Sequence, residues 1–494
     1  MTPAVSLIAI GEKMMKELKQ IAIDAIEKNS EIFTALSDKI WEYAELSLLE
    51  YKSAAEYVKL LAELGFEVEE RVAGIDTAFL GKFGTGAPVI GILGEFDALS
   101  GLSQAGGRLE KCELVKGGTG HGCGHNLLGA GALAAAYGVK EYLQKTGKSG
   151  TVIFFGTPGE EGGAGKAFMA KEEIWRSLDA ALTWHPSDAN EIVGGTCNSC
   201  IQVLYKYQGV AAHAAGDPED GRSALDAVEL MNIGVQYLRE HTKDDARIHY
   251  AIIDGGGFSP NVVQPTASVL YMTRSVKVSD TLELQARVDK IADGAALMTE
   301  TSYERVFIDG CSNTVPNHTL EKLLYKNMCE VGVATYTDDE VAFATALKDT
   351  YKTHGLPTIA AKYDPKAKKL ISELTDGGKK PLNDFVAPLY EGDYFEAGST
   401  DVGDVSWQTP TAQINTVCFT SGAPGHSWQN VSLGKTSIAH KGLISAGKIL
   451  AASAVELFES PELLKAAKEE FLIAAADGYT CPIPENEKAK AISI

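Results

Sequence analysis

The pattern of apolar and polar positions predicts alternating helices and strands. From residue 11 to 65 apolar residues recur with a period near 3.6, as in amphipathic helices, and Gly65 suits the left-handed position that follows a helix. A helix rich in small residues is expected at 126–143. Strand-like runs lie at 66–72, 77–83, 88–96, 151–157 and 179–185. Strands that alternate with helices in this way indicate an α/β layered domain.

The order of elements changes near Cys197. From there the pattern predicts a strand at 199–209, a helix at 223–240, strands at 247–254 and 268–278, a helix at 280–300 and a strand at 303–310. This β-α-β-β-α-β order is that of a ferredoxin-like unit. We therefore expect an α+β domain at 198–312, inserted into an α/β domain that comprises 1–197 and 313–494.

The rest of the chain is predicted to complete the α/β domain. Its elements are helices at 318–332, 338–355 and 437–460 and a strand at 411–420. Between them, a stretch rich in Lys and Asp at 362–384 is expected to be exposed.

Length, charge and cysteine content narrow the class of protein. A chain of 494 residues is too long for one hydrophobic core, in agreement with two domains. The net charge of -21 leaves no basic patch for phosphates or an anionic membrane, so nucleic-acid and membrane partners are not expected. The N-terminus lacks the features of a signal peptide, no apolar run reaches spanning length, and the eight cysteines form no regular framework. We therefore expect a cytoplasmic protein with reduced thiols.

The first candidate for chemistry is GHGCGHN, in which Cys123 and His125 lie two residues apart. The glycines let the backbone fold closely enough for both side chains to face one point. A thiolate and an imidazole are good ligands for zinc or manganese-class divalent ions. On this motif alone, a metal site and a reactive or merely buried cysteine are equally well supported.

Three further motifs place ionisable groups at predicted strand ends or on glycine-rich loops. TPGEEGG carries Glu160 and Glu161, TWHP carries His185, and SGAPGHSW carries His426. Ligands and catalytic groups gather at the carboxyl ends of strands in open α/β sheets. Of two adjacent carboxylates, one can bind a metal ion while the other carries a proton. Each motif alone also fits a solvated turn or a structural histidine, but four such motifs together indicate a metal site.

The segment GEFDAL adds Glu95 and Asp97, two residues apart at a predicted strand end and therefore on one face. Asp97 could orient a ligand histidine by accepting a hydrogen bond from its ring. An exposed acidic strand end is the competing interpretation.

Six motifs, in this order and at this spacing, resemble those of a known family. They are GEFDALSG, GHGCGHN, TPGEEGG, TWHP, GVAAHAAGDPEDGRSALDA and GAPGHS. Along nearly its whole length the chain resembles the aminoacylase and carboxypeptidase-type metallohydrolases, in the amidohydrolase branch that acts on N-acyl and amino-acid conjugates. The resemblance implies a two-metal, zinc-peptidase-like catalytic domain at 1–197 and 313–494, and an inserted ferredoxin-like lid and dimerisation domain at 198–312.

The resemblance also implies roles for single residues. Glu160 matches the general base of the family. In the inserted domain, His213 matches a histidine that contacts the reacting carbonyl, usually in the site of the other subunit. Asn261 and Arg274 match substrate-facing positions, and the planar fork of Arg274 suits a carboxylate. The ligands of two divalent ions per subunit, Mn2+ or Zn2+, are matched by Cys123, His125, Glu161, His185 and His426.

Some positions depart from the wider family. Asn126 replaces an Asp that follows Cys-Gly-His in many relatives, and Glu95 stands where peptidase relatives have a ligand histidine. The long segment 332–393 could wall the pocket. The motif GSTDVGDVSW at 398–407 matches a pocket motif of the aminobenzoyl-glutamate branch.

The activity that the resemblance implies is metal-dependent hydrolysis of the amide bond of an N-acyl amino acid, with p-aminobenzoyl-glutamate as the expected substrate. The expected partner is an identical chain or a related A-type subunit, bound through the inserted domain. One alternative is a dipeptidase or another N-acyl-amino-acid amidohydrolase, because acyl specificity resides in the shape of the pocket. Another is a non-catalytic subunit that binds a conjugate or a partner, although the presence of Glu160 and all five ligand positions argues against it.

Overall fold

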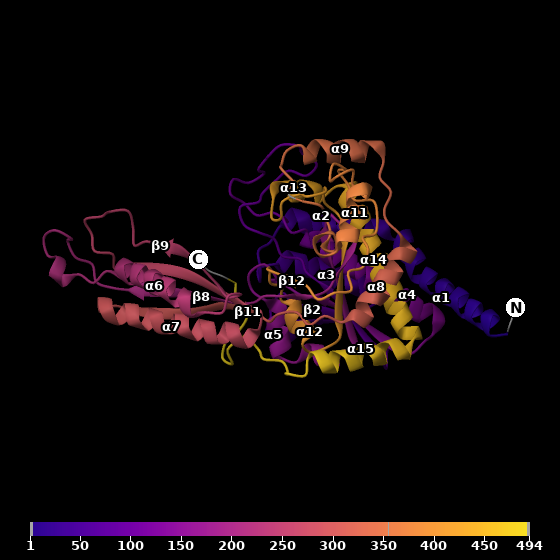
Figure 1. The fold of residues 1–494 in the computed structure, drawn as a ribbon, viewed down its shortest axis with the longest axis horizontal. Coiled ribbons are helices and arrows are strands. Elements are labelled where there is room, and N and C mark those ends of the chain that lie inside the picture. The colour runs from indigo at the N-terminus through magenta and orange to yellow at the C-terminus, as the bar shows by residue number, and fades with distance from the viewer. Residues whose placement is uncertain (1–2, 354, 492–494) are drawn as a thin grey trace.

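The computed structural model describes residues 3–353 and 355–491, which form two lobes (Figure 1). The larger lobe contains a seven-stranded mixed sheet in the order β1-β2-β4-β3-β5-β13-β6. Its strands are β1 Glu67–Glu70, β2 Phe79–Thr85, β3 Val89–Gly94, β4 Gly150–Gly156, β5 Ala180–Ser187, β6 Glu191–Val193 and β13 Thr411–Val417. The α/β architecture predicted for this part of the chain is confirmed.

Four adjacent strands of this sheet run in the same direction. β4, β3, β5 and β13 pair in parallel, so their carboxyl ends meet at one edge of the sheet. Both faces of these strands are buried, as is usual when helices cover a parallel sheet. Ile92 and Phe154 belong to one hydrophobic core, and Leu93 and Phe155 belong to the other.

Helices cover the two faces of the sheet. α4 and α14 lie against one face with α1 and α2 outside them, and α5 and α12 lie on the other face. The helices of this lobe are α1 Pro3–Lys28, α2 Ser30–Tyr43, α3 Tyr51–Glu63, α4 His125–Thr146, α5 Gly165–Lys171, α8 His318–Val331, α9 Asp338–Lys348, α10 Ile359–Tyr363, α11 Pro365–Leu374, α12 Val402–Ser406, α13 Trp428–Leu433, α14 Ser437–Glu459 and α15 Pro461–Ala474. Within 3–353 and 355–491, no helix has both the length and the apolar character needed to cross a membrane.

Small residues let α4 approach the sheet closely. A Cβ at Gly129 would lie 2.6 Å from the carbonyl oxygen of Glu95, and a Cβ at Gly131 would lie 2.6 Å from the ring of Trp184. Real Cβ atoms do not approach so closely, so larger residues would push the helix away from β3 and β5. The helix begins at His125, and this packing therefore sets the position of the predicted ligands at its start.

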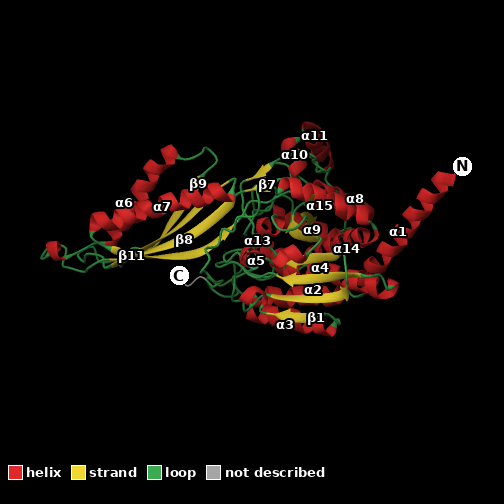
Figure 2. Ribbon diagram, turned by 90° about the horizontal axis from the view of Figure 1, so that it is seen from below, coloured by secondary structure: helices red, strands yellow, loops and turns green. Residues whose placement is uncertain are grey.

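The smaller lobe is a four-stranded antiparallel sheet in the order β11-β8-β10-β9, with two helices on one face (Figure 2). Its elements are β8 Ser199–Gln208, α6 Ala224–Leu238, β9 Arg247–Asp254, β10 Thr266–Ser275, α7 Val278–Thr299 and β11 Ser302–Cys311. The predicted β-α-β-β-α-β order is present, with the strand order of a ferredoxin-like unit. The domain boundaries at 197/198 and 312/313 stay predictions.

The exposure predicted for 362–384 is wrong in part. Ala367 and Ile371, on one face of α11, are buried with Ala360 and Ala361 of α10. The lysines of α11 lie on its outer face. Because the apolar residues recur with the helical period, they form one buried face within a charged sequence.

Candidate metal centre and active site

The shared carboxyl edge of the parallel strands brings the predicted groups together. Glu95 directly follows β3, Glu160 and Glu161 follow β4, His185 lies near the end of β5, and His426 lies on the loop after β13. Ligands in open α/β sheets bind at such an edge, where strand ends and loops supply side chains from distant parts of the chain.

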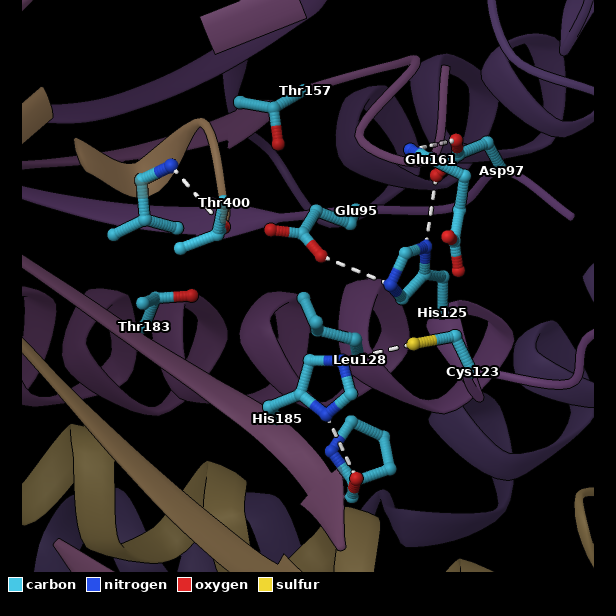
Figure 3. A network of polar contacts seen from close by, with 12 residues as sticks. Glu95, Asp97, Cys123, His125, Leu128, Thr157, Glu161, Thr183, His185 and Thr400 are labelled. Atoms are coloured by element: carbon cyan, nitrogen blue, oxygen red, sulfur yellow. Dashed lines mark hydrogen bonds and ion pairs between the residues drawn. The ribbon is translucent and has the colours of Figure 1, made fainter. Parts of the chain in front are cut away.

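Gly124 sets the geometry of the Cys-Gly-His segment. Its φ of +85° lies in the left-handed region, and a Cβ there would lie 2.8 Å from the ring of Phe419. Glycine alone meets both conditions without strain. Cys123 and His125 consequently face the same space, and the sulfur of Cys123 lies 3.3 Å from Nε2 of His185 (Figure 3).

The donor atoms form overlapping sets with the spacing of metal ligands. Three sets, each with atoms within 4.8 Å of one another, are Cys123–His125–His185, Cys123–Glu161–His426 and Glu95–His125–Glu160. Oε1 of Glu161 lies 3.5 Å from Nε2 of His426. Two donors bound to one ion at zinc-like distances lie about 3.0–3.6 Å apart, as these pairs do. Cys123 and His125 each belong to two of the three sets, so the sets share donors.

Unsatisfied donor atoms fit the same interpretation. Nε2 of His125 and Oε1 of Glu161 are buried and form no hydrogen bond within the described part of the chain, although Nε2 lies 3.2 Å from Oε2 of Glu95 and Oε1 lies 3.5 Å from Nε2 of His426. Buried polar atoms without a hydrogen bond are rare and costly, and a cation would satisfy both. A thiolate, imidazoles and a carboxylate together suit Zn2+ and related ions.

Asp97 orients the ring of His125. Nδ1 of His125 donates to Oδ1 of Asp97 at 2.8 Å, whereas Oδ2 accepts from Oγ of Ser47 at 2.7 Å and from the backbone N–H of Glu161 at 2.9 Å. Burial acts to raise the pKa of Asp97, but these donors outweigh it and lower the pKa to about 2. With the proton on Nδ1, Nε2 presents its lone pair to the candidate ion.

Burial and neighbouring charges perturb the pKa values of the centre. Burial, followed by the neighbouring carboxylates of Glu95 and Glu161, raises the pKa of Glu160 well above its usual range. Burial also raises the pKa of the Cys123 thiol, and burial with the nearby His125 lowers the pKa of His185 to about 4. Divalent cations would reverse the penalty on the acidic groups, because opposite charge favours their ionised forms.

His426 is the most exposed member of the centre. Its side chain is 56% exposed, and its backbone φ of +50° lies in the left-handed region. A non-glycine residue held there is strained, which is frequent where a side chain must be aimed at a functional site.

Segment 332–393 contacts the loop that carries His426, since Nζ of Lys348 donates to the carbonyl oxygen of Ser421 at 2.6 Å.

A cavity of about 230 Å³ opens beside the centre, between the two lobes. It is lined by Glu160, Glu161, Ala164, Cys200, Gln202, Met272, Arg274, Asp309, Gly310, Cys311, Ser399, Thr400, Asp401 and His426. Nη1 of Arg274 reaches across it and donates to Oγ of Ser399 at 2.7 Å. Among these lining residues none comes from 332–393, so the structure gives no support to the expectation that this segment walls the pocket.

Two predicted substrate-facing residues lie elsewhere. The segments of His213 and Asn261 are held together by a backbone hydrogen bond of 2.9 Å from Ala214 to Asn261, beyond the far end of β8. Cys200, at the near end of this ten-residue strand, lines the cavity. A strand of that length spans about 33 Å, so His213 does not reach the cavity of its own chain in this structure.

Buried charged residues that the motifs did not single out also hold the centre. Lys166 lies between Glu95 and Asp401, with contacts of 2.7 and 2.6 Å. Glu50 accepts from the backbone N–H of Gly159 at 2.9 Å and so fixes the loop that carries the two glutamates; burial raises its pKa to about 8. The only sequence signal for Lys166 was a lysine that interrupts the apolar start of a helix next to TPGEEGG.

Comparison with known proteins shows the family. Residues 92–395 match the model of peptidase family M20/M25/M40, and the chain belongs to this family. With the candidate metal centre described above, the chain is a metal-dependent amide hydrolase of this family.

Individual relatives agree with this family and with the expected branch. The chain is 44% identical over 477 residues to the B subunit of p-aminobenzoyl-glutamate hydrolase of Escherichia coli (strain K12), a match that covers 96% of this chain and 98% of the relative. It is 27% identical over 473 residues to the Xaa-Arg dipeptidase of Mus musculus, with 92% of each chain covered. A Bacillus subtilis structure described as a dinuclear metal binding peptidase from the M20 family shares the fold, with a TM-score of 0.52, 16% identity, and coverage of 88% of this chain and 99% of that chain.

Proposed function

We propose that this chain hydrolyses the amide bond of p-aminobenzoyl-glutamate and releases p-aminobenzoate and glutamate. The observation that carries the proposal is the presence of Glu160 beside an intact set of metal donors, in a chain that is 44% identical along nearly its whole length to part of a hydrolase named for this substrate. The cavity also contains Arg274, whose guanidinium group can bind a substrate carboxylate with two hydrogen bonds.

We infer that two divalent ions, Zn2+ or Mn2+, bind to Cys123, His125, Glu161, His185 and His426. Cys123 belongs to two of the three donor sets, which together contain all five of these residues, and this sharing supports a pair of neighbouring ions. When bound, such ions supply Lewis acidity and lower the pKa of a water so that hydroxide forms near neutral pH.

Glu160 would act as the proton carrier. It lies in the cavity next to Glu161, where its carboxylate can take a proton from the attacking water. It then donates that proton to the amide nitrogen, which is needed because an amide anion is a very poor leaving group.

We propose that the active assembly is a dimer, either of this chain or with a related A-type subunit, joined through the inserted lobe. β9 is one of the two edge strands of the four-stranded sheet, and an exposed edge can pair with another chain. Exposed apolar side chains lie near this edge, at Ile233 and Tyr237 on α6 and at Tyr250 and Ile252 on β9. His213 would then enter the partner's cavity and contact the reacting carbonyl, and Asn261 would accompany it.

We also propose a cytoplasmic location. The sulfurs of Cys200 and Cys311 lie 3.4 Å apart on neighbouring strands without a bond, and the other cysteines are free as well. Reduced thiols at that spacing fit a reducing compartment.

A dipeptidase activity is the second candidate, because the chain is 27% identical over most of its length to an Xaa-Arg dipeptidase. Both activities use the same centre and differ in the groups that the cavity admits. The assay therefore compares p-aminobenzoyl-glutamate with dipeptides and with other N-acyl amino acids.

The test measures amine release by chelated protein that is reloaded with Zn2+ or Mn2+, with and without a co-expressed A-type subunit. Preferred, metal-dependent release from p-aminobenzoyl-glutamate is the expected result. Preference for a dipeptide would select the second candidate. Binding of the conjugate without release, by folded and metal-loaded protein in either assembly, would refute hydrolysis and favour a non-catalytic binding subunit.

A further inference from the structure

A buried cluster of three charges lies beside the metal centre. Lys166 extends from the first turn of α5, and its Nζ lies 2.7 Å from Oε1 of Glu95 and 2.6 Å from Oδ1 of Asp401. The three side chains are 0%, 4% and 1% exposed, respectively. The backbone N–H of Lys166 also donates to Oδ2 of Asp401 at 2.9 Å. Lysine is almost never buried so completely unless it is paired, so the position demands an ammonium group.

One end of the cluster faces the candidate ions. Lys166 holds only Oε1 of Glu95, whereas Oε2 lies 3.2 Å from Nε2 of His125 (Figure 3). Glu95, His125 and Glu160 form one of the three sets of donor atoms that could surround a cation. The ammonium group therefore fixes the carboxylate so that its free oxygen points into the centre.

The other end of the cluster reaches the substrate side of the cavity. Asp401 belongs to the segment 398–401, and Ser399 in the same segment accepts the hydrogen bond from Arg274. Ser399, Thr400 and Asp401 all line the cavity. Lys166 thus connects Glu95, at the end of β3, with the segment 398–401. That segment in turn contacts Arg274 on β10.

We propose that Lys166 is a positioning residue that acts through Glu95 and Asp401. It holds the free oxygen of Glu95 within the donor set that also contains His125 and Glu160, and it anchors the segment that holds Arg274 in the cavity. This inference rests on the proposed function for the identity of the metal donors and of the substrate-binding arginine. It requires no change in the protonation of any member of the cluster.

The first measurement is the affinity for Zn2+, read by competition with a chromophoric chelator and without any substrate. Lys166→Met is expected to weaken binding about 10–100-fold, as does the loss of other residues that orient metal ligands. The matched control is Lys19→Met, because Lys19 is likewise buried between two carboxylates, Glu330 and Glu456, in a different part of the lobe. It should leave the affinity unchanged.

Two further variants separate positioning from simple charge balance. The wild-type cluster holds two carboxylates and one ammonium, a net charge of -1, and Lys166→Met/Asp401→Asn keeps that charge in Glu95 alone. Weak ion binding by this double variant supports positioning, whereas full recovery of the affinity overturns it. In a cycle with Glu95→Gln, the effects should be strongly non-additive, because Lys166 acts through Glu95. Additive effects would contradict the proposal.

Steady-state kinetics supply the second readout. At saturating Zn2+, Lys166→Met should raise KM for an acyl-glutamate more than for an uncharged acyl-amide, since the anchor of Arg274 is lost. An unchanged Zn2+ affinity together with an unchanged ratio of these KM values would overturn the proposal. If Lys166→Met does not fold, the Zn2+ affinity of Glu95→Gln is measured instead. An unchanged affinity for Zn2+ overturns the proposal, and a weakened affinity supports it. Because Zn2+ binding needs no turnover, a failure of the proposed substrate leaves this result interpretable.

Discussion

Replacement of Asp97 by Asn tests whether Asp97 orients the ring of His125 so that it can bind a metal ion. The carboxylate accepts three hydrogen bonds in a fully buried position, and its pKa is lowered from 3.8 to about 2. A difference of that size corresponds to about 2 kcal/mol of stability at neutral pH in ion-free protein. Asn removes the charge and can also present an N–H group to Nδ1, which would favour the wrong ring tautomer of His125.

The sign of the pH dependence follows from the lowered pKa. Because the folded protein holds Asp97 ionised more strongly than the unfolded chain does, the stabilisation is present above about pH 4 and is lost as the pH falls through about 2. In urea unfolding of ion-free protein at pH 7, the free energy of unfolding of Asp97→Asn should therefore be about 2 kcal/mol lower than that of the wild type. This difference should shrink below about pH 4. The affinity for Zn2+ should fall about 10–100-fold at pH 7.

Ser47→Ala is the matched control for this variant. It removes one hydrogen bond to Oδ2 of Asp97 and leaves the contact with His125, so it should cost about 1 kcal/mol without a change in ion affinity. If Asp97→Asn bound Zn2+ as tightly as the wild type and unfolded at the same urea concentration, the role assigned to Asp97 would be refuted.

Further predictions concern turnover, ion content, substrate binding and assembly. Glu160→Gln should lower kcat by about 10²–10⁴-fold while bound metal, measured by atomic emission, stays at the wild-type level. Cys123→Ser should lose bound ions in the same measurement, because its sulfur belongs to two donor sets, and unchanged content would exclude a bridging thiolate. Arg274→Lys should raise KM for acyl-glutamates with little effect on kcat, and equal loss with uncharged substrates would contradict carboxylate binding. If the chain forms homodimers, the His213→Ala and His185→Ala chains should each be inactive alone. A mixture in which these chains exchange subunits should recover about a quarter of the wild-type activity. No recovery would exclude a site shared between identical chains.

The fold was predictable where one periodicity dominated a segment. The buried strands β3, β4 and β5 and the helix α4 appear close to the expected bounds, because continuous apolar runs and small-residue helices have few other stable arrangements. The charged helix α11 was misjudged, because lysines on its outer face masked an apolar stripe of two residues. Composition alone does not separate an exposed loop from a helix with one buried face.

The centre was predictable for groups that lie on motifs at strand ends. Parallel strands bring their carboxyl ends to one edge, so Glu161 and His185 could be expected at the same edge, where each shares a donor set with Cys123. Lys166 and Asp401 could not be paired in the same way, since they lie 235 residues apart and only Asp401 belongs to one of the motifs. Only the packing of α5 against the segment 398–401 shows that their charges compensate each other.

The far position of His213 has a consequence for how the rate depends on enzyme concentration. If His213 contacts the substrate as proposed, it does so in a second molecule, because it lies beyond the end of β8 that is remote from the cavity of its own chain. The smallest working unit would then contain two chains, and every chain would be both donor and recipient of a catalytic group. Upon dilution below the dissociation constant of the dimer, the initial rate would fall with the square of the chain concentration, while each separate chain kept its fold and its bound ions.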